Sequence, residues 1–504
     1  MGSNVDEDRE PWYRPRNIAL AILLLVSVSL IWLGIWVRSV IWAQPTMSFN
    51  AFDELNKLAM KDQPQGEDAW PIIIEVVQRL VDSNEYLPGF RSDVDLRDAL
   101  AGPWDVQRLA VELELTSAIL DLDIMDLLDQ TVGLERSVHT YPSTLKVPGL
   151  EEHDPSNPLW MMLLPELGDL HVISRALLVS MRQAAEERRH KDVVRAFTNV
   201  LCLGRHTGMS PLALEQGVGL RIMRDAFDEL QMQIGEHLLD EPTYRAILKV
   251  LDRFEPSDNI EVAIETEFLQ FLDMVQRVHT DNGRGDGIVI FSEITKPISD
   301  PNDQFDSLWD SEEAAPRVLN FSGYDLPRRE ESIATAELVR QDRFAMSKLN
   351  SVQRSNFTKH VELGVFPVPH ELIILNAFYA GASYMVMRSY DETRASLQAL
   401  RISLALELHR LERGTYPDTL DQLAPGFFTD IPTDPTHDGP FIYRLLSDDS
   451  RGYILYSTGV DQTDDGGKMD KDIRYRRDLA FVSGRGEGLD YVFNLPRPPL
   501  KPDN

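Results

Sequence analysis

Five aspartates lie within twelve positions of the stretch LYSTGVDQTDDGGKMDKDI, residues 455–473, directly after a predicted strand. They are Asp461, Asp464, Asp465, Asp470 and Asp472. Calcium binds about six to eight oxygen ligands in a flexible shell, and carboxylates are the usual donors. Gly466 and Gly467 allow the chain to double back. The stretch therefore predicts a site for a divalent cation, and the alternative is an acidic loop that faces solvent.

The chain as a whole is strongly acidic. Its 504 residues include 50 Lys and Arg against 81 Asp and Glu, which gives a formal net charge of −31. Such a surface repels nucleic-acid phosphates, so no nucleic-acid partner is expected, whereas divalent cations are well tolerated. The single cysteine, Cys202, excludes an intrachain disulfide, and its apolar neighbours in VLCLG predict a buried, unreactive thiol.

Residues 18–37, IALAILLLVSVSLIWLGIWV, form an uncharged run of twenty residues. A helix of this length covers roughly 30 Å, the thickness of a bilayer core. A cleaved signal peptide is the alternative, but the length of the run and the bulky residues of VIWAQ argue against cleavage. We expect a cytoplasmic tail of residues 1–17 and a transmembrane anchor of residues 18–43. Arg14 and Arg16 favour an inner-membrane protein with the bulk of its chain on the extracytoplasmic side; reversed topology is the alternative.

Residues 46–389 are predicted to form a mostly α-helical domain, either a bundle or a solenoid. The apolar residues recur with helical spacing at Ile73, Val76, Val77 and Leu80, and again at Tyr244, Ile247, Leu248 and Leu251. The polar break EERRHKD separates two helices of similar length. An irregular insert is expected at about residues 281–330, which are rich in turn formers and acidic residues.

Residues 390–504 are predicted to form a small α+β domain. Leu397, Leu400, Leu404, Leu408 and Leu411 line one face of a long helix, and short apolar runs after it read as antiparallel strands. The fold class expected for the whole chain is therefore mainly α, with an N-terminal transmembrane helix and a small α+β domain at the C-terminal end.

Three motifs in this last region occur in a fixed order: LERGTYPDTLDQL, then IPTDPTHDGPFIYR, then YILYSTGVDQTDDGG. This series resembles the globular domain of the major pseudopilins of type II secretion. The resemblance implies a calcium ion in the loop, with Asp461, Asp470 and Asp472 at matching positions and Gln462 in place of a glycine. The hydrophobic segment lies far upstream, so we do not expect a polymerised pilus subunit. The middle region, including residues 164–208, also resembles uncharacterised envelope proteins of planctomycete-type bacteria.

The chain shows no nucleophile elbow, phosphate-binding loop or dinucleotide fingerprint. We therefore predict a membrane-anchored envelope protein with a binding or scaffolding role, a protein partner, and an accessory part in a secretion or surface assembly. The alternative is an extracytoplasmic hydrolase that uses carboxylates of the helical domain, with Glu265 and Glu267 in AIETEFLQFL as the candidates.

Overall fold

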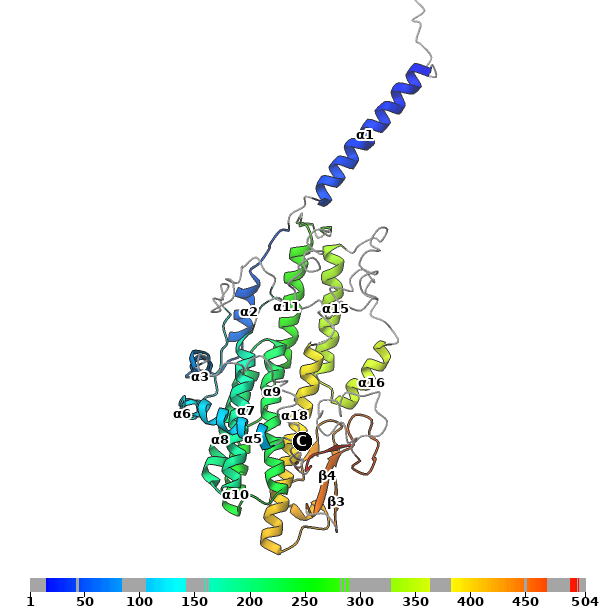
Figure 1. Ribbon diagram of the computed structural model, residues 1–504. Coiled ribbons are helices and arrows are strands. Elements are labelled where there is room, and N and C mark those ends of the chain that lie inside the picture. The colour runs from blue at the N-terminus through cyan, green and yellow to red at the C-terminus, as the bar shows by residue number, and fades with distance from the viewer. Residues whose placement is uncertain are drawn as a thin grey trace, which may run out of the picture. The chain divides into compact units, whose positions relative to one another are not determined.

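The computed structural model describes residues 15–41, 45–83, 106–141, 164–281, 328–362, 382–447, 451–468 and 490–495, with a few isolated positions between them. Thirteen α-helices and a small C-terminal sheet region are formed by these residues (Figure 1). At this level the predicted fold class is confirmed. The helices are α1 (Pro15–Ile41), α2 (Ala51–Met60), α3 (Trp70–Asp82), α5 (Val106–Leu120), α6 (Ile124–Asp129), α7 (Glu166–Glu186), α8 (His190–Gly208), α9 (Ala213–Gly235), α10 (Glu241–Leu251), α11 (Ile260–Val278), α15 (Arg329–Ser347), α16 (Ser351–Glu362) and α18 (Ala382–Arg413).

The strands are short and antiparallel. They are β1 (Thr433–Asp434), β2 (Gly439–Pro440), β3 (Ile442–Leu445), β4 (Tyr453–Ser457) and β5 (Tyr491–Val492). β1 pairs with β2, and β4 lies between β3 and β5 in a three-stranded sheet. The central strand β4 is buried along its whole length, as expected for a strand covered on both faces.

The chain divides into two compact units. Unit 1 comprises Met1–Asn50, Leu272–Ala336 and Val368–Leu375, and unit 2 comprises Ala51–Phe271, Glu337–Pro367 and Asn376–Asn504. Within unit 1, the Gln276 side chain accepts a hydrogen bond from the Ser48 amide at 3.0 Å and donates one to the Phe49 carbonyl at 3.2 Å. These contacts fix the segment that follows α1 in the sequence.

The helical core of unit 2 follows the apolar spacing of the sequence. Ile73 and Val76 on α3 are fully buried, as are Ile247 and Leu251 on α10. Asp240 is the N-cap of α10, and its side chain accepts a hydrogen bond from the Thr243 amide at 3.0 Å. A proline lies in the first turn of the helix, where proline is favoured.

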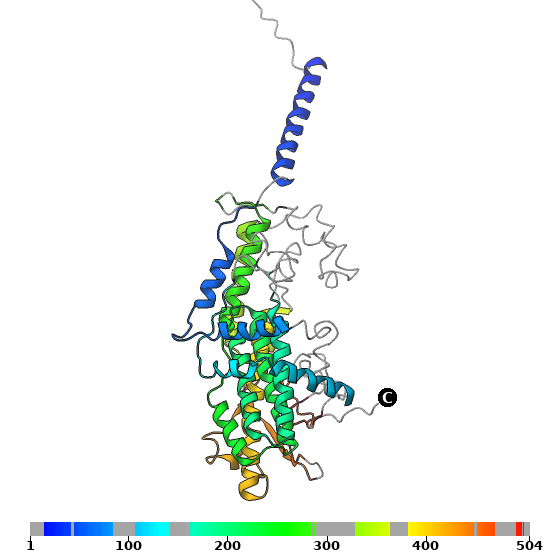
Figure 2. The same cartoon turned by 60° about the vertical axis from the view of Figure 1, so that its left-hand side comes forward.

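α7, α8 and α9 lie side by side in both views of the ribbon (Figures 1 and 2). α7 ends at Glu186 and α8 begins at His190, so the predicted polar break is a tight helix–helix connection. α8 and α9 approach each other backbone to backbone. A Cβ atom on Gly219 would overlap the Gly204 carbonyl oxygen and the Gly208 amide nitrogen. Small residues at these three positions therefore set the spacing of the two helices.

α18 contributes to two cores at once. Leu397, Leu400, Leu404 and Leu408 pack into the helical bundle, as the predicted leucine face requires, whereas Leu411 is 44% exposed. Ala395, Ala399, Ile402 and Leu406 join the core of the small sheet. One helix therefore joins the bundle and the sheet within unit 2.

Among the residues that the structure describes, no helix has the combined length and apolarity that a membrane crossing needs. The predicted anchor of residues 18–43 includes residues 35–43, whose side chains lie outside the described part of the chain. Most of the predicted insert at residues 281–330 also lies outside it.

His206 on α8 gives the stability of unit 2 a defined pH dependence. Its side chain is 1% exposed, and burial lowers its pKa from 6.5 to about 4. Between pH 6.5 and pH 4 the unfolded chain therefore binds a proton that the native chain does not. The stabilisation is fully present above pH 6.5 and is lost as the pH falls toward 4.

We expect His206 to account for a loss of roughly 3 kcal/mol in the free energy of unfolding between pH 7 and pH 4. Urea denaturation at several pH values, with His206→Gln for comparison, measures this term. The substitution should flatten the pH dependence, whereas parallel curves for the two proteins would contradict the assignment.

Candidate functional site

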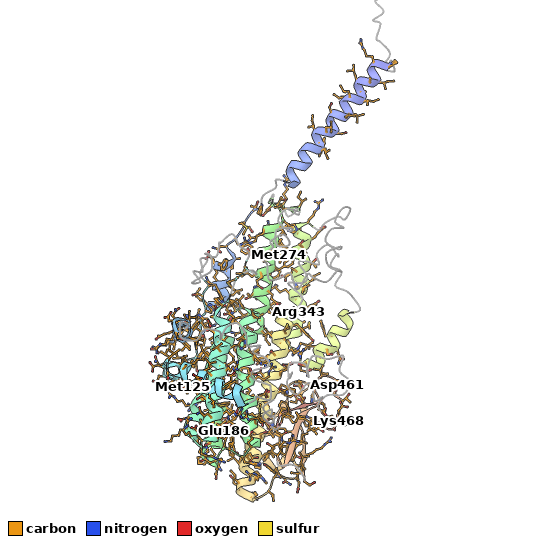
Figure 3. The ribbon with its side chains drawn as sticks, in the orientation of Figure 1. Met125, Glu186, Met274, Arg343, Asp461 and Lys468 are labelled. Carbon is orange, nitrogen blue, oxygen red and sulfur yellow. The ribbon has the colours of Figure 1, made fainter. Side chains whose placement is uncertain are left out.

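The acidic loop predicted from the sequence follows β4, the central strand of the small sheet. Figure 3 labels Asp461 and Lys468 in this loop. Four residues of the loop adopt left-handed backbone conformations, namely Gly459 at φ 65°, Gln462 at φ 57°, Gly466 at φ 79° and Gly467 at φ 73°. Gln462 thus takes the conformation for which glycine is favoured, and the turn is formed without one at that position.

Two of the predicted ligands already have partners in the loop. The exposed Asp461 side chain accepts a hydrogen bond from the Thr463 amide at 3.0 Å. Asp464 accepts hydrogen bonds from the Tyr456 hydroxyl at 2.8 Å and from Arg444 at 2.6 Å. The Tyr456 hydrogen bond, with further help from Arg444, lowers the pKa of Asp464. Both carboxylates therefore lie at the loop surface, and the lowered pKa of Asp464 favours its ionised form.

Asp465 is half-buried and lies close to Asp490, which was not among the predicted ligands. Asp490 immediately precedes β5, is 1% exposed, and accepts a hydrogen bond from the Gly467 amide at 2.6 Å. Within the described residues, Oδ2 of Asp465 and Oδ1 of Asp490 are buried and have no hydrogen-bond partner. Burial raises the pKa of Asp490, and the charges of Asp464 and Asp465 raise it further. Two unsatisfied carboxylate oxygens on neighbouring residues are the kind of donor that a hard cation would satisfy.

The other two predicted ligands, Asp470 and Asp472, lie outside the described residues.

The two carboxylates considered for hydrolysis both have a partner, and within the described residues only Oε2 of Glu267 is buried without a hydrogen bond to it. Glu265 pairs with Arg340 at 2.7 Å. Glu267 is 5% exposed and accepts a hydrogen bond from the Ser383 amide at 2.5 Å, in the first turn of α18. Burial raises the pKa of Glu267. Its carboxylate therefore caps the start of α18, which accounts for an acidic residue on this buried face.

A second cluster of ligand-type side chains lies in the helical part of unit 2. His139, Glu166 and Glu215 each offer one ligand atom, and these atoms all lie within 4.8 Å of one another. Glu166 is the first residue of α7, and Glu215 lies in the first turn of α9. Both carboxylates therefore sit at helix N-termini, where the backbone dipole stabilises negative charge.

Hydrogen bonds hold Glu215 at the centre of this cluster. Glu215 is fully buried; its Oε1 lies 2.5 Å from Nδ1 of His139, and its Oε2 accepts a hydrogen bond from the Tyr141 hydroxyl. Burial and the adjacent Glu215 charge raise the pKa of Tyr141 well above its ordinary value, so the hydroxyl remains a donor. Burial raises the pKa of Glu166, and the Glu215 carboxylate adds to that increase.

The segment that carries His139 and Tyr141 is fixed on both sides. The Trp70 ring stacks on the His139 ring with centroids 4.2 Å apart, and the His139 and Tyr141 rings lie 4.1 Å apart. The Asn56 side chain accepts a hydrogen bond from the Tyr141 amide at 2.7 Å and donates one to the Tyr141 carbonyl at 3.0 Å. The imidazole is therefore held in one orientation beside the carboxylates.

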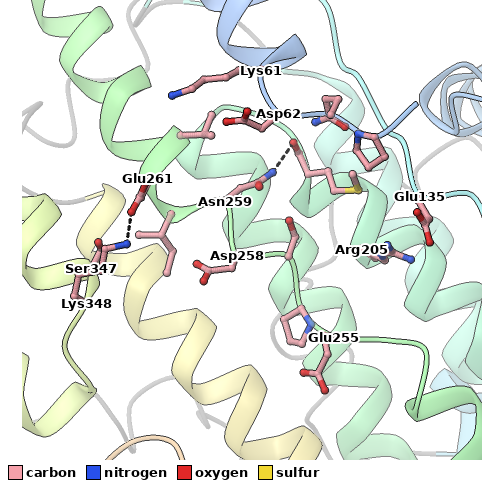
Figure 4. A pocket seen from close by; sticks show the side chains of 17 residues that line it. Lys61, Asp62, Glu135, Arg205, Glu255, Asp258, Asn259, Glu261, Ser347 and Lys348 are labelled. Atoms are coloured by element: carbon pink, nitrogen blue, oxygen red, sulfur yellow. Dashed lines mark hydrogen bonds and ion pairs between the residues drawn. The ribbon is translucent and has the colours of Figure 1, made fainter. Parts of the chain in front are cut away.

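A pocket of about 520 Å³ in unit 2 is lined by side chains of both charges (Figure 4). Lys348 pairs with Glu261 across it, and the Asn259 side chain donates a hydrogen bond to the Met209 carbonyl at 2.9 Å. A polar, partly self-paired wall of this kind is typical of a solvated depression and offers little to an apolar ligand.

The histidine–glutamate cluster had no recognisable signal in the sequence. Its members occur in SVHTYP, LPELGD and LALEQG. The three residues lie 27 and 49 positions apart in the chain, which matches no metal-ligand spacing. Asp490 had a weak signal, because it lies within GLDYVFNL, one of the short runs that predicted a strand. The chain matches no family model, no curated protein and no solved structure.

Proposed function

We propose that this chain is a membrane-tethered envelope protein with an extracytoplasmic binding or scaffolding role, and that α1 is its tether. The observation that carries the proposal is the exposure of the apolar side chains of α1. Leu24 and Leu25 are each 68% exposed and Trp32 is 69% exposed. An apolar surface of this extent is stable only when covered, and a lipid bilayer matches a helix that is apolar on all sides. Partition of the full chain between the membrane and soluble fractions of expressing cells tests the tether.

The C-terminal region supports a pseudopilin-like cap on this tethered protein. α18 is a 32-residue helix, and Ala399, Ile402 and Leu406 on it pack against a small antiparallel sheet. This is the arrangement that the likeness to pseudopilin globular domains implies. α18 is at the same time part of the helical bundle, so the cap is built onto the larger domain.

A binding role is favoured over hydrolysis at Glu265 and Glu267. Arg340 neutralises the first carboxylate, and the start of α18 engages the second. A general acid or base needs a carboxyl group that can reach a substrate proton. We therefore propose a protein partner for the extracytoplasmic surface, as an accessory to a secretion or surface assembly.

We further propose that the loop after β4 binds calcium, with Asp465 and Asp490 as the central donors. The fit rests on their two buried oxygen atoms that lack hydrogen-bond partners. Asp461 and Asp464 are close in sequence and can add oxygen donors, and Asp470 and Asp472 complete the predicted set. A bound cation would offset the repulsion among these carboxylates.

Calcium should raise the melting temperature of the full-length protein and release measurable heat on titration. Asp465→Asn and Asp490→Asn should each remove most of the shift, because each replaces a charged oxygen donor by a neutral amide. Differential scanning calorimetry with and without calcium measures the effect.

Asp430→Asn is the matched control, since Asp430 is an exposed aspartate before β1 and outside the loop. It should keep the full calcium response. A wild-type protein that shows neither heat nor a rise in melting temperature would refute the calcium proposal and leave the tether untouched.

A further inference from the structure

We propose that His139, Glu166 and Glu215 bind a divalent first-row transition-metal ion within the helical part of unit 2. Their ligand atoms already lie within 4.8 Å of one another. Bonds from such an ion to nitrogen and oxygen are about 2.0–2.2 Å long, which places the ligands of one ion about 3–3.5 Å apart. Small side-chain rotations bring three groups from their present spacing to that distance.

The charge balance of the cluster favours a cation. Two carboxylates converge on one imidazole, and Glu215 is fully buried. In the described part of the chain, neither Glu166 nor Glu215 pairs with a lysine or arginine. Buried carboxylates are usually paired with a cationic side chain or bound to a metal, because an uncompensated buried charge is costly. A metal ion would replace the hydrogen bond that joins Nδ1 of His139 and Oε1 of Glu215 at 2.5 Å.

The donor set selects the kind of metal. A histidine nitrogen together with carboxylate oxygens suits zinc, manganese, iron or cobalt, whereas calcium and magnesium prefer oxygen ligands alone. This site is therefore chemically distinct from the all-oxygen loop after β4. Three protein ligands also leave at least one coordination position for water or for a small anionic ligand.

The groups around the ligands are those that orient a metal site. The Tyr141 hydroxyl binds the second oxygen of Glu215, and the stacked ring of Trp70 holds the His139 imidazole. Outer contacts of this type fix ligand direction, and their loss commonly weakens metal binding. Glu166 is only half-buried, so an ion can enter the cluster from solvent past the Glu166 side chain.

Titration of the tag-free full-length protein in detergent with Co²⁺ tests the site by its visible absorption. Excess Ca²⁺ is present throughout to occupy oxygen-only sites. We expect one equivalent to bind, and Zn²⁺ to displace it. Glu166→Gln removes a ligand from a half-buried position, so the fold is retained, and it should weaken Co²⁺ binding at least about tenfold. His139→Gln should weaken binding and also change the absorption spectrum, because it removes the nitrogen ligand.

Glu135→Gln is the matched control, because Glu135 is an exposed glutamate four residues before His139. It should bind Co²⁺ as tightly as the wild type. Circular dichroism of each variant confirms that its helices are intact. Absence of Co²⁺ binding, or equal affinity in the wild type and folded Glu166→Gln, would overturn the site; binding lost only in Asp465→Asn would place the metal in the loop instead.

Discussion

Replacing Gly219 with alanine is expected to lower the free energy of unfolding by about 1–3 kcal/mol or more, although alanine is the better helix former. The added methyl group would overlap the Gly204 carbonyl oxygen and the Gly208 amide nitrogen. Both are backbone atoms of α8, so the overlap is relieved only if α8 and α9 move apart. That movement would loosen the packing around Phe197 and Phe227, whose rings lie 6.4 Å apart between these helices. Urea denaturation followed by circular dichroism measures the loss.

The same substitution two residues earlier should act in the opposite direction. Gly217 lies in α9, and apart from its chain neighbours and the backbone of its own helix no atom lies within 4 Å of a Cβ built on it. Gly217→Ala should therefore raise stability by about 0.5–1 kcal/mol through the lower entropy of the unfolded chain. If both variants gained stability, the close approach of the two helices would be wrong.

The sequence predicted those parts of the fold in which one periodic pattern decides the structure. Ile73 and Val76 on α3 are examples, since their spacing selects a helix with one buried face. The leucine stripe of α18 was predicted for the same reason. The opposite face of α18 was not, because Ala395 and Ala399 are too small to stand out as core residues. Their small size instead lets the sheet pack closely on the helix.

The two candidate metal sites also differ in how much of each could be predicted from the sequence. The aspartates after β4 are adjacent in sequence, so their clustering could be seen without a structure. His139, Glu166 and Glu215 are brought together only by the packing of α7 and α9 against the segment before residue 142. No local sequence pattern predicts that these three residues lie close together. Each glutamate, taken alone, is simply an acidic residue in the first turn of a helix, which is common.

The second large effect concerns α1. Arginine at the centre of a membrane-spanning helix costs about 2.5–3.5 kcal/mol, so Leu24→Arg combined with Leu30→Arg should oppose insertion by roughly 5–7 kcal/mol. A matched control places two arginines at exposed leucines elsewhere, Leu214 and Leu338, which are 61% and 62% exposed. The control adds the same charge to the chain and leaves α1 unchanged.

Flotation of cell membranes after alkaline extraction, with the protein detected by immunoblot, tests the proposed α1 tether most directly. The wild type and the Leu214→Arg/Leu338→Arg control should float with the membranes, and the Leu24→Arg/Leu30→Arg variant should remain in the soluble or aggregated fraction. A wild-type protein that stays soluble after extraction, or a double-arginine α1 variant that floats as the wild type does, would contradict the account.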